Sequence, residues 1–372
     1  MKSKLALVSC FDYDLQELYK ALKRAVDLLG GINNFIRPKS KVLVKPNLLQ
    51  PALPQQAITT HPELIRAVIR ILKEIDCEIY LGDSPSSWNK EDIEEVYLRC
   101  GIKKIAKEEK IELINFNQPV WKNNFPLTKY LDLCDYFISL PKFKTHNFTI
   151  LTGAIKNLFG LVCGPYKIEL HRKYPNPEDF SKMLIDLYLT AKPDLTIVDG
   201  IWALEADGPA TKGIPKNTGF ILVGNDGVSI DVILALLMGL KPQDIPTNQE
   251  AKKRNLSNLS LEDIEILGDN LFDFLNKDFK LPSTSLLKKI PSPILKVLRE
   301  LIKFYPKIKH KNCSLCGRCI SICPQKAIEI KNKRIHINYS QCIHCFCCQE
   351  VCIYKAIIIK KSILAKLLGL MS

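Results

Sequence analysis

The sequence has no apolar segment long enough to cross a membrane. A spanning helix needs about 18 or more uncharged apolar residues, and the longest candidate, residues 227–240, is interrupted by Asp231. The apolar stretch before Cys10 is about five residues long, whereas a secretory signal needs a core of roughly 7 to 15. These absences predict a cytoplasmic protein with no transmembrane segment, in which thiols stay reduced.

Common nucleotide-binding and nucleic-acid-binding motifs are also missing. No Gly-x-Gly-x-x-Gly follows a predicted strand and no Gly-x-x-x-x-Gly-Lys-Ser/Thr occurs, so nicotinamide and nucleoside-triphosphate binding lack their usual loops. No recognised nucleic-acid motif or aromatic stacking platform accompanies the basic charge. The sequence therefore predicts no specific nucleic-acid partner.

Acidic residues are scarce in one part of the chain only. Residues 284–372 contain 17 Lys and Arg but 3 Asp and Glu, whereas residues 1–283 contain 36 of each sign. The whole formal excess of +14 therefore lies in the last quarter, as do nine of the 14 cysteines. At roughly 150 residues per domain, a 372-residue chain is expected to form about two domains. The two compositions predict a neutral large domain over 1–283 and a basic, cysteine-rich C-terminal part.

Eight of the C-terminal cysteines form an internal repeat. Each cysteine of the second set lies 29 positions after its counterpart, and Lys326-Ala327-Ile328 recurs at the same interval as Lys355-Ala356-Ile357. Structural zinc would not require a repeat of three thiols plus a distant fourth, and a disulfide framework would require an oxidising compartment. The repeat instead favours iron-sulfur clusters. The two sets are Cys313, Cys316, Cys319 and Cys323, and Cys342, Cys345, Cys348 and Cys352.

On these motifs, residues 311–360 resemble a bacterial-type ferredoxin domain that carries two 4Fe-4S clusters. The resemblance implies a crossed arrangement, in which the fourth cysteine of each set binds the other cluster. Ile353 stands where the second motif usually has proline, and Cys347 is a ninth cysteine that we expect to be a small filler beside the cluster. One cluster would bind Cys313, Cys316, Cys319 and Cys352, and the other Cys342, Cys345, Cys348 and Cys323.

A basic segment precedes the cysteines. Residues 284–310 are predicted to form an amphipathic linker helix, and residues 361–372 a short basic tail. Two oxidised clusters would reduce the local excess from +14 to roughly +10. Three interpretations of the linker remain open: a connecting helix with a solvated lysine face, a docking surface for an acidic redox partner, and a surface for an anionic membrane or nucleic acid.

The large domain alternates strand-like and helix-like segments. This alternation predicts an α/β fold with a mostly parallel sheet and helices on both faces, followed by a small α+β ferredoxin-like domain. Predicted strands are 5–9, 42–45, 78–81, 112–115, 136–140, 195–199 and 220–223, and predicted helices are 14–29, 62–75, 91–99, 180–191 and 228–238.

Polar residues follow several of the predicted strands. In a parallel sheet the carboxyl ends of the strands share one edge, so we expect these side chains to meet there and bind an anion such as a phosphate or carboxylate. Helix caps, turns and solvated lysines are the ordinary alternative. The proposed proton-transfer residues are Lys142, Lys144 and His146, the proposed ligand-binding residues are Lys45, Asn47, Asp83, Ser84, Lys156, Asn157 and Asp199, and His171, Arg172 and Asp226 are further candidates.

The order of these segments resembles the family known as domain of unknown function 362, which is often fused to such a ferredoxin tail. The resemblance covers essentially the whole chain. The family name implies no reaction. The resemblance rests most specifically on four segments. They are Lys45-Pro46-Asn47, Gly82-Asp83-Ser84, Pro141-Lys142 with Lys144-Thr145-His146, and Gly153 with Lys156-Asn157 and Gly160.

Three functions remain open at this point. The first is a redox protein whose clusters relay electrons to or from a ligand on the large domain, which would make it a ferredoxin-linked oxidoreductase. The second is a non-catalytic electron carrier or redox-sensing binding module. The third is an enzyme of non-redox chemistry with structural clusters. The remaining cysteines, Cys10, Cys77, Cys100, Cys134 and Cys163, show no ligand spacing and are expected to be core residues.

The ligand assignment predicts which cysteines the clusters require. Replacing Cys316 or Cys345 by Ser should remove about four irons, because each would lose one of four thiolate ligands. Cys347→Ser should retain all of the iron. Iron analysis and absorbance near 400 nm of anaerobically reconstituted protein measure both effects, and an equal loss from Cys347→Ser would refute the choice of Cys348.

Overall fold

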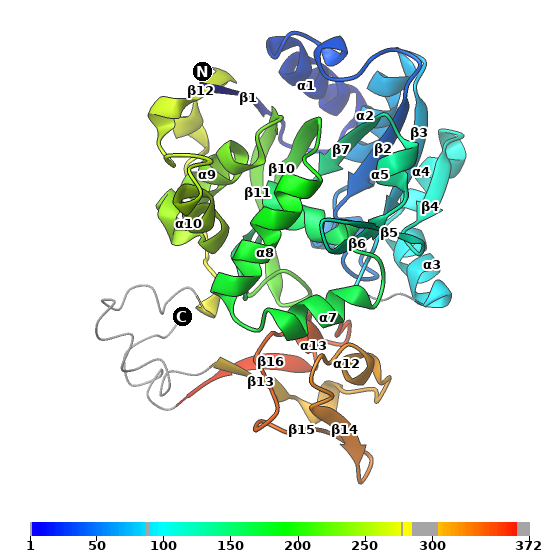
Figure 1. Ribbon diagram of the computed structural model, residues 1–372, viewed down its shortest axis with the longest axis vertical. Helices are drawn as coiled ribbons and strands as arrows, with labels where there is room; N and C mark the ends of the chain where they lie inside the picture. Colours follow the sequence, from blue (N-terminus) through cyan, green and yellow to red (C-terminus); the bar gives the residue numbers. More distant parts are fainter. Residues whose placement is uncertain (1, 87–88, 277, 285–303, 363–372) are drawn as a thin grey trace.

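The computed structural model describes residues 2–86, 89–276, 278–284 and 304–362, which form a large α/β domain and a small C-terminal domain (Figure 1). The large domain is built on a ten-stranded sheet with the order β12-β1-β11-β10-β7-β2-β3-β4, to which β8 and β9 attach beside β10. Its strands are β1 (Ser3–Ser9), β2 (Lys41–Pro46), β3 (Glu78–Asp83), β4 (Glu112–Asn115), β7 (Tyr136–Leu140), β8 (Lys142–His146), β9 (Ile150–Thr152), β10 (Leu195–Ala206), β11 (Gly213–Gly224) and β12 (Ile264–Gly268).

Most of the sheet is parallel. Strands β4, β3, β2, β7 and β10 run in the same direction, and β1 is parallel to β12. Only β11 among the strands of the main path is antiparallel to both of its neighbours. The predicted fold class is therefore confirmed, and the carboxyl ends of β2, β3 and β7 meet at one edge of the sheet.

The helices begin where local capping predicts. Asp14 accepts hydrogen bonds from the backbone N–H groups of Gln16 and Glu17 at the start of α1, and the ring of His61 caps α2 just before Pro62. The helices are α1 (Leu15–Leu28), α2 (Pro62–Lys73), α3 (Lys90–Arg99), α4 (Ile102–Glu108), α5 (Tyr130–Leu133), α6 (Ala154–Asn157), α7 (Tyr166–Lys173), α8 (Pro177–Thr190), α9 (Gly227–Leu237) and α10 (Pro246–Lys253).

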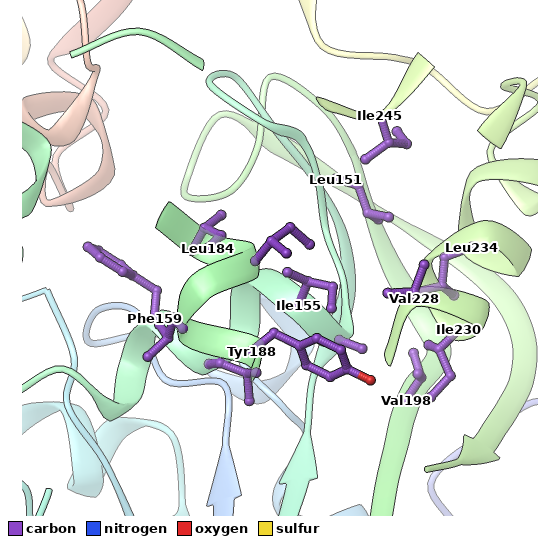
Figure 2. Close-up of a cluster of buried hydrophobic side chains, with 14 of the residues drawn as sticks. Leu151, Ile155, Phe159, Leu184, Tyr188, Val198, Val228, Ile230, Leu234 and Ile245 are labelled. Atoms are coloured by element: carbon purple, nitrogen blue, oxygen red, sulfur yellow. The ribbon is translucent and has the colours of Figure 1, made fainter. Parts of the chain in front are cut away.

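Two hydrophobic cores lie on opposite faces of the sheet. In β1 the side chains alternate, so that Leu5 and Leu7 pack in one core and Ala6 and Val8 in the other. One core contains residues of α1 and α2, and the other contains residues of α6, α8 and α9. Figure 2 shows part of the second core, with Tyr188 of α8 facing α9 and Phe159 at one edge. Each fully buried aliphatic side chain contributes about 1.5–3 kcal/mol, so these cores fix the sheet edge that carries the polar residues.

All seven predicted strands and all five predicted helices are present, but the structure also contains elements that we did not predict. Strand β10 continues to Ala206 and forms a long antiparallel hairpin with β11. The segment after β7 forms a strand of its own, β8, whose five residues are all buried. A small hairpin of β5 (Pro119–Lys122) and β6 (Phe125–Thr128) completes the large domain.

The small domain contains two two-stranded sheets and two short helices. Strand β13 (Phe304–Ile308) pairs with β16 (Ile357–Lys361), and β14 (Ile328–Lys331) pairs with β15 (Arg334–Ile337). Helices α12 (Arg318–Ser321) and α13 (Cys347–Glu350) each follow one set of cysteines.

The internal repeat is also present in the backbone. Left-handed residues recur at an interval of 29: Leu315 and His344, Gly317 and Phe346, and Lys326 and Lys355. These conformations are uncommon outside glycine, so three matched pairs indicate that both halves fold around the same turns.

The basic linker differs from our prediction where the structure describes it. Residues 304–308, which we assigned to the end of the linker helix, form β13 instead, because their apolar side chains face the small domain and their backbone pairs with β16. The small domain therefore begins by Phe304. Lys361 belongs to β16 rather than to a tail, whereas residues 285–303 and 363–372 lie outside the described ranges.

The small domain packs against the large one at the edge where β8 ends, beside α7 (Figure 1). Asn147 donates a hydrogen bond of 3.0 Å to Gln349 of α13, and Thr211 of the β10–β11 turn donates one of 3.2 Å to the carbonyl oxygen of Cys352. Arg318 forms ion pairs with Asp92 and Glu95 of α3 at 3.1 and 2.8 Å. Polar side chains on both sides thus set the position of the cysteine repeat.

Within the described ranges, no helix combines the length and apolar character that a membrane crossing requires.

Arg318 provides a test of the domain contact. Arg318→Ala should destabilise the attachment of the small domain by roughly 1–3 kcal/mol, because it removes two charge-assisted contacts from a half-buried site. Lys103→Ala removes an exposed ion pair between α4 and Glu94 of α3, and should lower the stability by less than about 1 kcal/mol. Guanidinium unfolding and limited proteolysis of the anaerobic holoprotein measure the difference, and equal effects would contradict this role of Arg318.

Candidate functional site

A cavity of about 80 Å³ lies between the two domains. That volume is several times the space that one water molecule needs, and is suited to a small ligand. From the large domain, the cavity is lined chiefly by Lys45, Asn47, Asp83, Ser84, Lys144, His146, Thr152, Lys156, Asn157, Phe159, Gly160, Lys167 and His171, and from the small domain by Ile322, Cys347, Glu350 and Val351.

Lys45 and Asp83 form a buried ion pair at the floor of the cavity. The two side chains come from the ends of β2 and β3, and their nearest atoms, Nζ and Oδ1, are 2.8 Å apart. Lys45 also donates to Asn157 Oδ1 at 3.2 Å, and Leu48 donates its backbone N–H to Asp83 Oδ2 at 2.7 Å. Burial lowers the pKa of Lys45, while Asp83 acts in the opposite direction. The shared hydrogen bonds hold this pair as a rigid polar base.

Gly160 allows the backbone to approach this pair. A Cβ atom at Gly160 would lie 2.3 Å from Asp83 Oδ1 and 2.5 Å from Lys45 Nζ. Any larger residue would therefore displace the ion pair, which gives a physical reason for the glycine of the Asn157-Leu158-Phe159-Gly160 segment.

Three further lysines reach the cavity without a carboxylate of their own. Lys144 Nζ donates to the carbonyl oxygen of Ile58 at 2.6 Å, and Lys167 donates to the carbonyl oxygens of Ser84 and Pro85. Lys156 lies over the rings of Phe159 and Phe180, at 5.4 and 5.7 Å from their centroids. In the part of the chain that the structure describes, none of these three lysines forms an ion pair within 4.0 Å.

The lysines are held close to neutrality by their surroundings. Burial lowers the pKa of Lys144 to about 7, with a further contribution from Lys156, and burial lowers the pKa of Lys167 to about 7 as well. Four lysines and two carboxylates line the cavity, so the protonated site carries a formal excess of two positive charges. Such a site favours an anion, which would restore the charge balance.

His146 and Glu350 connect the two domains across the cavity. The Nε2 atom of His146 lies 3.3 Å from a carboxylate oxygen of Glu350. His146 Nδ1 accepts from the backbone N–H of Phe148 at 3.1 Å, which assigns the proton of the neutral ring to Nε2. Burial lowers the pKa of His146 to about 4. Burial alone would raise the pKa of Glu350, but His146, Lys156 and His171 lower the pKa of this carboxyl group to about 2. A neutral His146 therefore donates to an ionised Glu350.

Several polar atoms that line the cavity have no hydrogen-bond partner in the described part of the chain. They are Asn47 Oδ1, Thr152 Oγ1 and His171 Nδ1. Thr152 and His171 are 3% and 6% exposed, so these groups are removed from bulk water. Unpaired buried polar atoms are costly, which indicates that the cavity holds a polar ligand or water.

Eight of the ten residues proposed from the sequence line the cavity, and two lie elsewhere. Lys45, Asn47, Asp83, Ser84, Lys144, His146, Lys156 and Asn157 all line the cavity. Lys142 and Asp199 do not; they form a separate buried ion pair of 2.9 Å, and Asp199 also accepts from Tyr13 at 2.7 Å. The bulge in β10 after Gly200 shifts the register, so that Lys142 pairs with Asp199 while Lys144 and His146 reach the cavity. Lys142 is thus a structural cation.

Of the further candidates from the sequence, His171 lines the cavity and the other two do not. Asp226 caps α9 by accepting from Val228 N–H, and Arg172 is exposed and does not line the cavity. Lys167, Thr152 and Glu350 were missed. Glu350 was detectable, because it is one of only three acidic residues after position 283 and lies inside the cysteine repeat.

The cysteines of each predicted ligand set lie close together. Cys313, Cys316, Cys319 and Cys352 line one hollow of the small domain. In the other set, burial raises the pKa of Cys342, and Cys345 and Cys323 lie close enough for their charges to raise it further. Cys348 is close to these three cysteines and also to Cys319 of the first set. Backbone N–H groups of Ala327 and Ala356 donate to the sulfur atoms of Cys323 and Cys352 at 3.2 and 3.3 Å, as expected for thiolate ligands. These positions are compatible with the ligand sets that the resemblance implies, and the count of two clusters and the crossed arrangement stay predictions.

The same coordinates do not group these thiols for a single metal ion. Among the described residues, no three His, Cys, Asp or Glu side chains meet closely enough to hold one ion. The four cysteines of the first set line one hollow.

Cys347 has a position that we did not predict. It is buried and lines the cavity, together with Glu350 from the same helix α13. It also packs against Cys345, Ile322 and Val351. The ninth cysteine therefore lies between Cys345 of the second set and the cavity, and its role as a filler stays a prediction.

The fold and this pair of sites define an α/β protein with an appended iron-sulfur domain. Residues 42–235 match the family described as domain of unknown function (DUF362), and the chain belongs to that family. Residues 305–353 match the 4Fe-4S dicluster domain, which supports cluster binding by the small domain. Both parts of the resemblance seen in the sequence are confirmed.

Two known proteins are similar to this chain. One is the thylakoid-associated protein sll1697 of Synechocystis sp., 28% identical over 312 residues that cover 82% of this chain and 95% of that protein. The other is the lactate racemase apoprotein from Thermoanaerobacterium thermosaccharolyticum, with a TM-score of 0.36 and 13% identity over 60% of this chain. The chain spans 54% of the racemase. The cytoplasmic location expected from the sequence stays a prediction.

The lysine pKa values predict how anion binding depends on pH. Between pH 6 and pH 8 a group with a pKa near 7 goes from mostly charged to mostly neutral. Sulfate stays a dianion over this range, so its affinity should fall roughly tenfold for each of Lys144 and Lys167 that it contacts. Isothermal titration calorimetry of the holoprotein measures the affinity.

A matched variant isolates the lysines from other titrating groups. Lys144→Met with Lys167→Met should weaken sulfate binding and make it nearly independent of pH, whereas Lys103→Met on the exposed face of α4 should retain the wild-type profile. A wild-type affinity that is the same at pH 6 and pH 8 would contradict the role of these lysines.

Proposed function

We propose that the protein is an iron-sulfur redox protein in which two 4Fe-4S clusters relay single electrons between a partner and a small anion bound in the cavity between the domains. One observation carries the proposal: the wall of the cavity combines lysines of the α/β domain with residues of the cysteine repeat itself. A ligand in this cavity would contact both domains at once.

The positions of the cysteines suggest an order of electron transfer. Cys316 of the first set is exposed, whereas Cys345 and Cys348 of the second set are buried. Cys345 packs in the same small core as Cys347, Ile322 and Val351, all three of which line the cavity. When bound, such clusters each accept and release one electron at a time. The outer set is thus placed to meet a partner, and the inner set to serve the cavity.

The residues of the large domain supply the functions that the clusters lack. Lys144, Lys156 and Lys167 bind and orient the anion by charge, and the Lys45–Asp83 pair fixes the floor beneath it. A two-electron reduction of an anionic substrate consumes protons as well as electrons. Lys144, with a pKa of about 7, is poised to hold and release a proton at Nζ at neutral pH.

The small domain also limits access to the cavity. His146–Glu350 and Asn147–Gln349 join the domains beside it, and a ligand in the cavity would be shielded from bulk water on the side of these contacts. Exclusion of water strengthens the charge interactions within the site and protects a reduced ligand from side reactions.

The proposal predicts that anion binding and cluster reduction are coupled. Sulfate in the cavity should lower the potential of one cluster by an amount on the order of tens of millivolts, because a nearby anion disfavours a second negative charge. By linkage, reduction should weaken sulfate binding by the same factor. Spectroelectrochemical titration of the reconstituted protein with and without sulfate measures the shift.

Variants separate this coupling from general salt effects. Lys144→Met with Lys156→Met should abolish the shift, while Lys331→Met, at the tip of the small domain, should retain it. Sulfate that binds in the cavity without moving either potential would favour the remaining interpretation, an enzyme of non-redox chemistry with structural clusters. A coupled site with no turnover of any substrate would favour a redox-sensing module.

A further inference from the structure

The outer face of the small domain has an exposed apolar centre. Cys316 is exposed, and the neighbouring Leu315 and Tyr354 are 39% and 45% exposed. Tyr354 and Cys316 line the same hollow as Cys313, Cys319 and Cys352. Tyr354 therefore lies beside the first set of cysteines, and Leu315 adjoins Cys316 in the chain.

Lysines from both domains surround this centre. Lys309 and Lys355 are exposed, and their backbones are joined to the ligand loop through Lys309 N–H to Ala356 O at 2.7 Å and Lys355 N–H to Cys352 O at 3.3 Å. Lys212, on the β10–β11 turn of the large domain, is close enough to both that their charges, after burial, lower its pKa. These three lysines, with Leu315, Cys316 and Tyr354, are called the outer surface below.

The lysines of the outer surface have no carboxylate partners in the described part of the chain. None of Lys212, Lys309 and Lys355 forms an ion pair within 4.0 Å there. The nearest carboxylate that influences Lys212 belongs to Asp207, which already accepts from the backbone N–H and hydroxyl of Ser283 at 2.8 and 2.6 Å. Positive charge is therefore gathered and left unpaired around an apolar centre.

We infer that the outer surface docks an acidic, single-electron redox protein. An apolar centre with a rim of one charge is suited to a small, transient interface, in which charge steers the encounter and close contact allows transfer. Lysines on two domains converge on the outer cysteines, so the surface exists only when the domains are assembled. A partner with an acidic rim around its own cofactor complements it.

The transfer balances as one electron. A reduced partner loses one electron and is oxidised by one unit, and the cluster held by the first set of cysteines gains it. No bond forms or breaks, and no proton moves at this surface. The inference rests on the proposed function only in requiring a cluster at Cys313, Cys316, Cys319 and Cys352.

Charge reversal at the outer surface provides the test. A photoreduced acidic 2Fe-2S ferredoxin is used as the probe, and reduction of the oxidised, reconstituted holoprotein is followed by stopped-flow absorbance near 400 nm. Lys309→Glu with Lys355→Glu should lower the second-order rate constant roughly tenfold or more at low salt, with most of the difference lost at 0.5 M salt. The same variant should react faster than wild type with a basic cytochrome c.

A matched control carries the same change in net charge. Lys331→Glu with Lys333→Glu alters two exposed lysines at the β14–β15 turn and should change the rate constant less than about twofold. Equal effects of the two double variants would overturn the proposal, because charge alone and not its location would then matter. Each variant must contain as much iron as the wild-type protein before its rate constant is compared.

Binding to lipid vesicles tests the alternative that the outer surface binds an anionic membrane. If Lys309→Glu with Lys355→Glu abolished binding to vesicles of anionic lipid and left the ferredoxin rate unchanged, the surface would bind a membrane and the proposal would be wrong. If the outer surface does not dock a redox protein, the sulfate-dependent shift in potential is still expected. Failure of this inference is therefore distinguishable from failure of the proposed function.

Discussion

Positive charge is buried at the boundary between the two domains in excess of the carboxylates that face it. Lys45 has Asp83, and His146 has Glu350, but in the described part of the chain Lys144, Lys156 and Lys167 form no ion pair and contact carbonyl oxygens or aromatic faces instead. Burying an unpaired ammonium group costs several kcal/mol, and burial lowers the pKa of all three, to about 7 for Lys144 and Lys167. An anion in the cavity removes this cost, and the rest of the site follows from that constraint.

The same constraint explains why the cavity needs both domains. The lysines come from β8, α6 and α7, and Glu350 of the ferredoxin-like domain acts on Lys144 and Lys156, whereas Asp83 acts on Lys167. Glu350 lies between Cys348 and Cys352 in the sequence, so the charge balance of the cavity is set by a residue of the cluster-binding loop. Charge in the cavity and charge on a cluster are therefore close enough to influence one another.

Much of this architecture was predictable because it follows from local patterns in the sequence. Alternation of apolar strands and helices is sufficient for the parallel sheet, and the interval of 29 residues is sufficient for the duplicated small domain. Lysines and polar residues at the ends of β2 and β3, and in β8 after β7, line one cavity. What the sequence cannot provide is register and contact between distant segments. The bulge in β10 separates Lys142 from Lys144, and the packing of α13 on β8 brings Cys347 and Glu350 into the cavity.

The proposed function requires that an anion and iron-sulfur clusters lie side by side in the protein. Anomalous diffraction from anaerobic crystals of the holoprotein soaked in selenate tests this in one measurement. We predict iron peaks within both sets of cysteines and a selenium peak among Lys144, Lys156 and Lys167. Selenate bound only elsewhere, or no iron beside Cys345, would contradict the account.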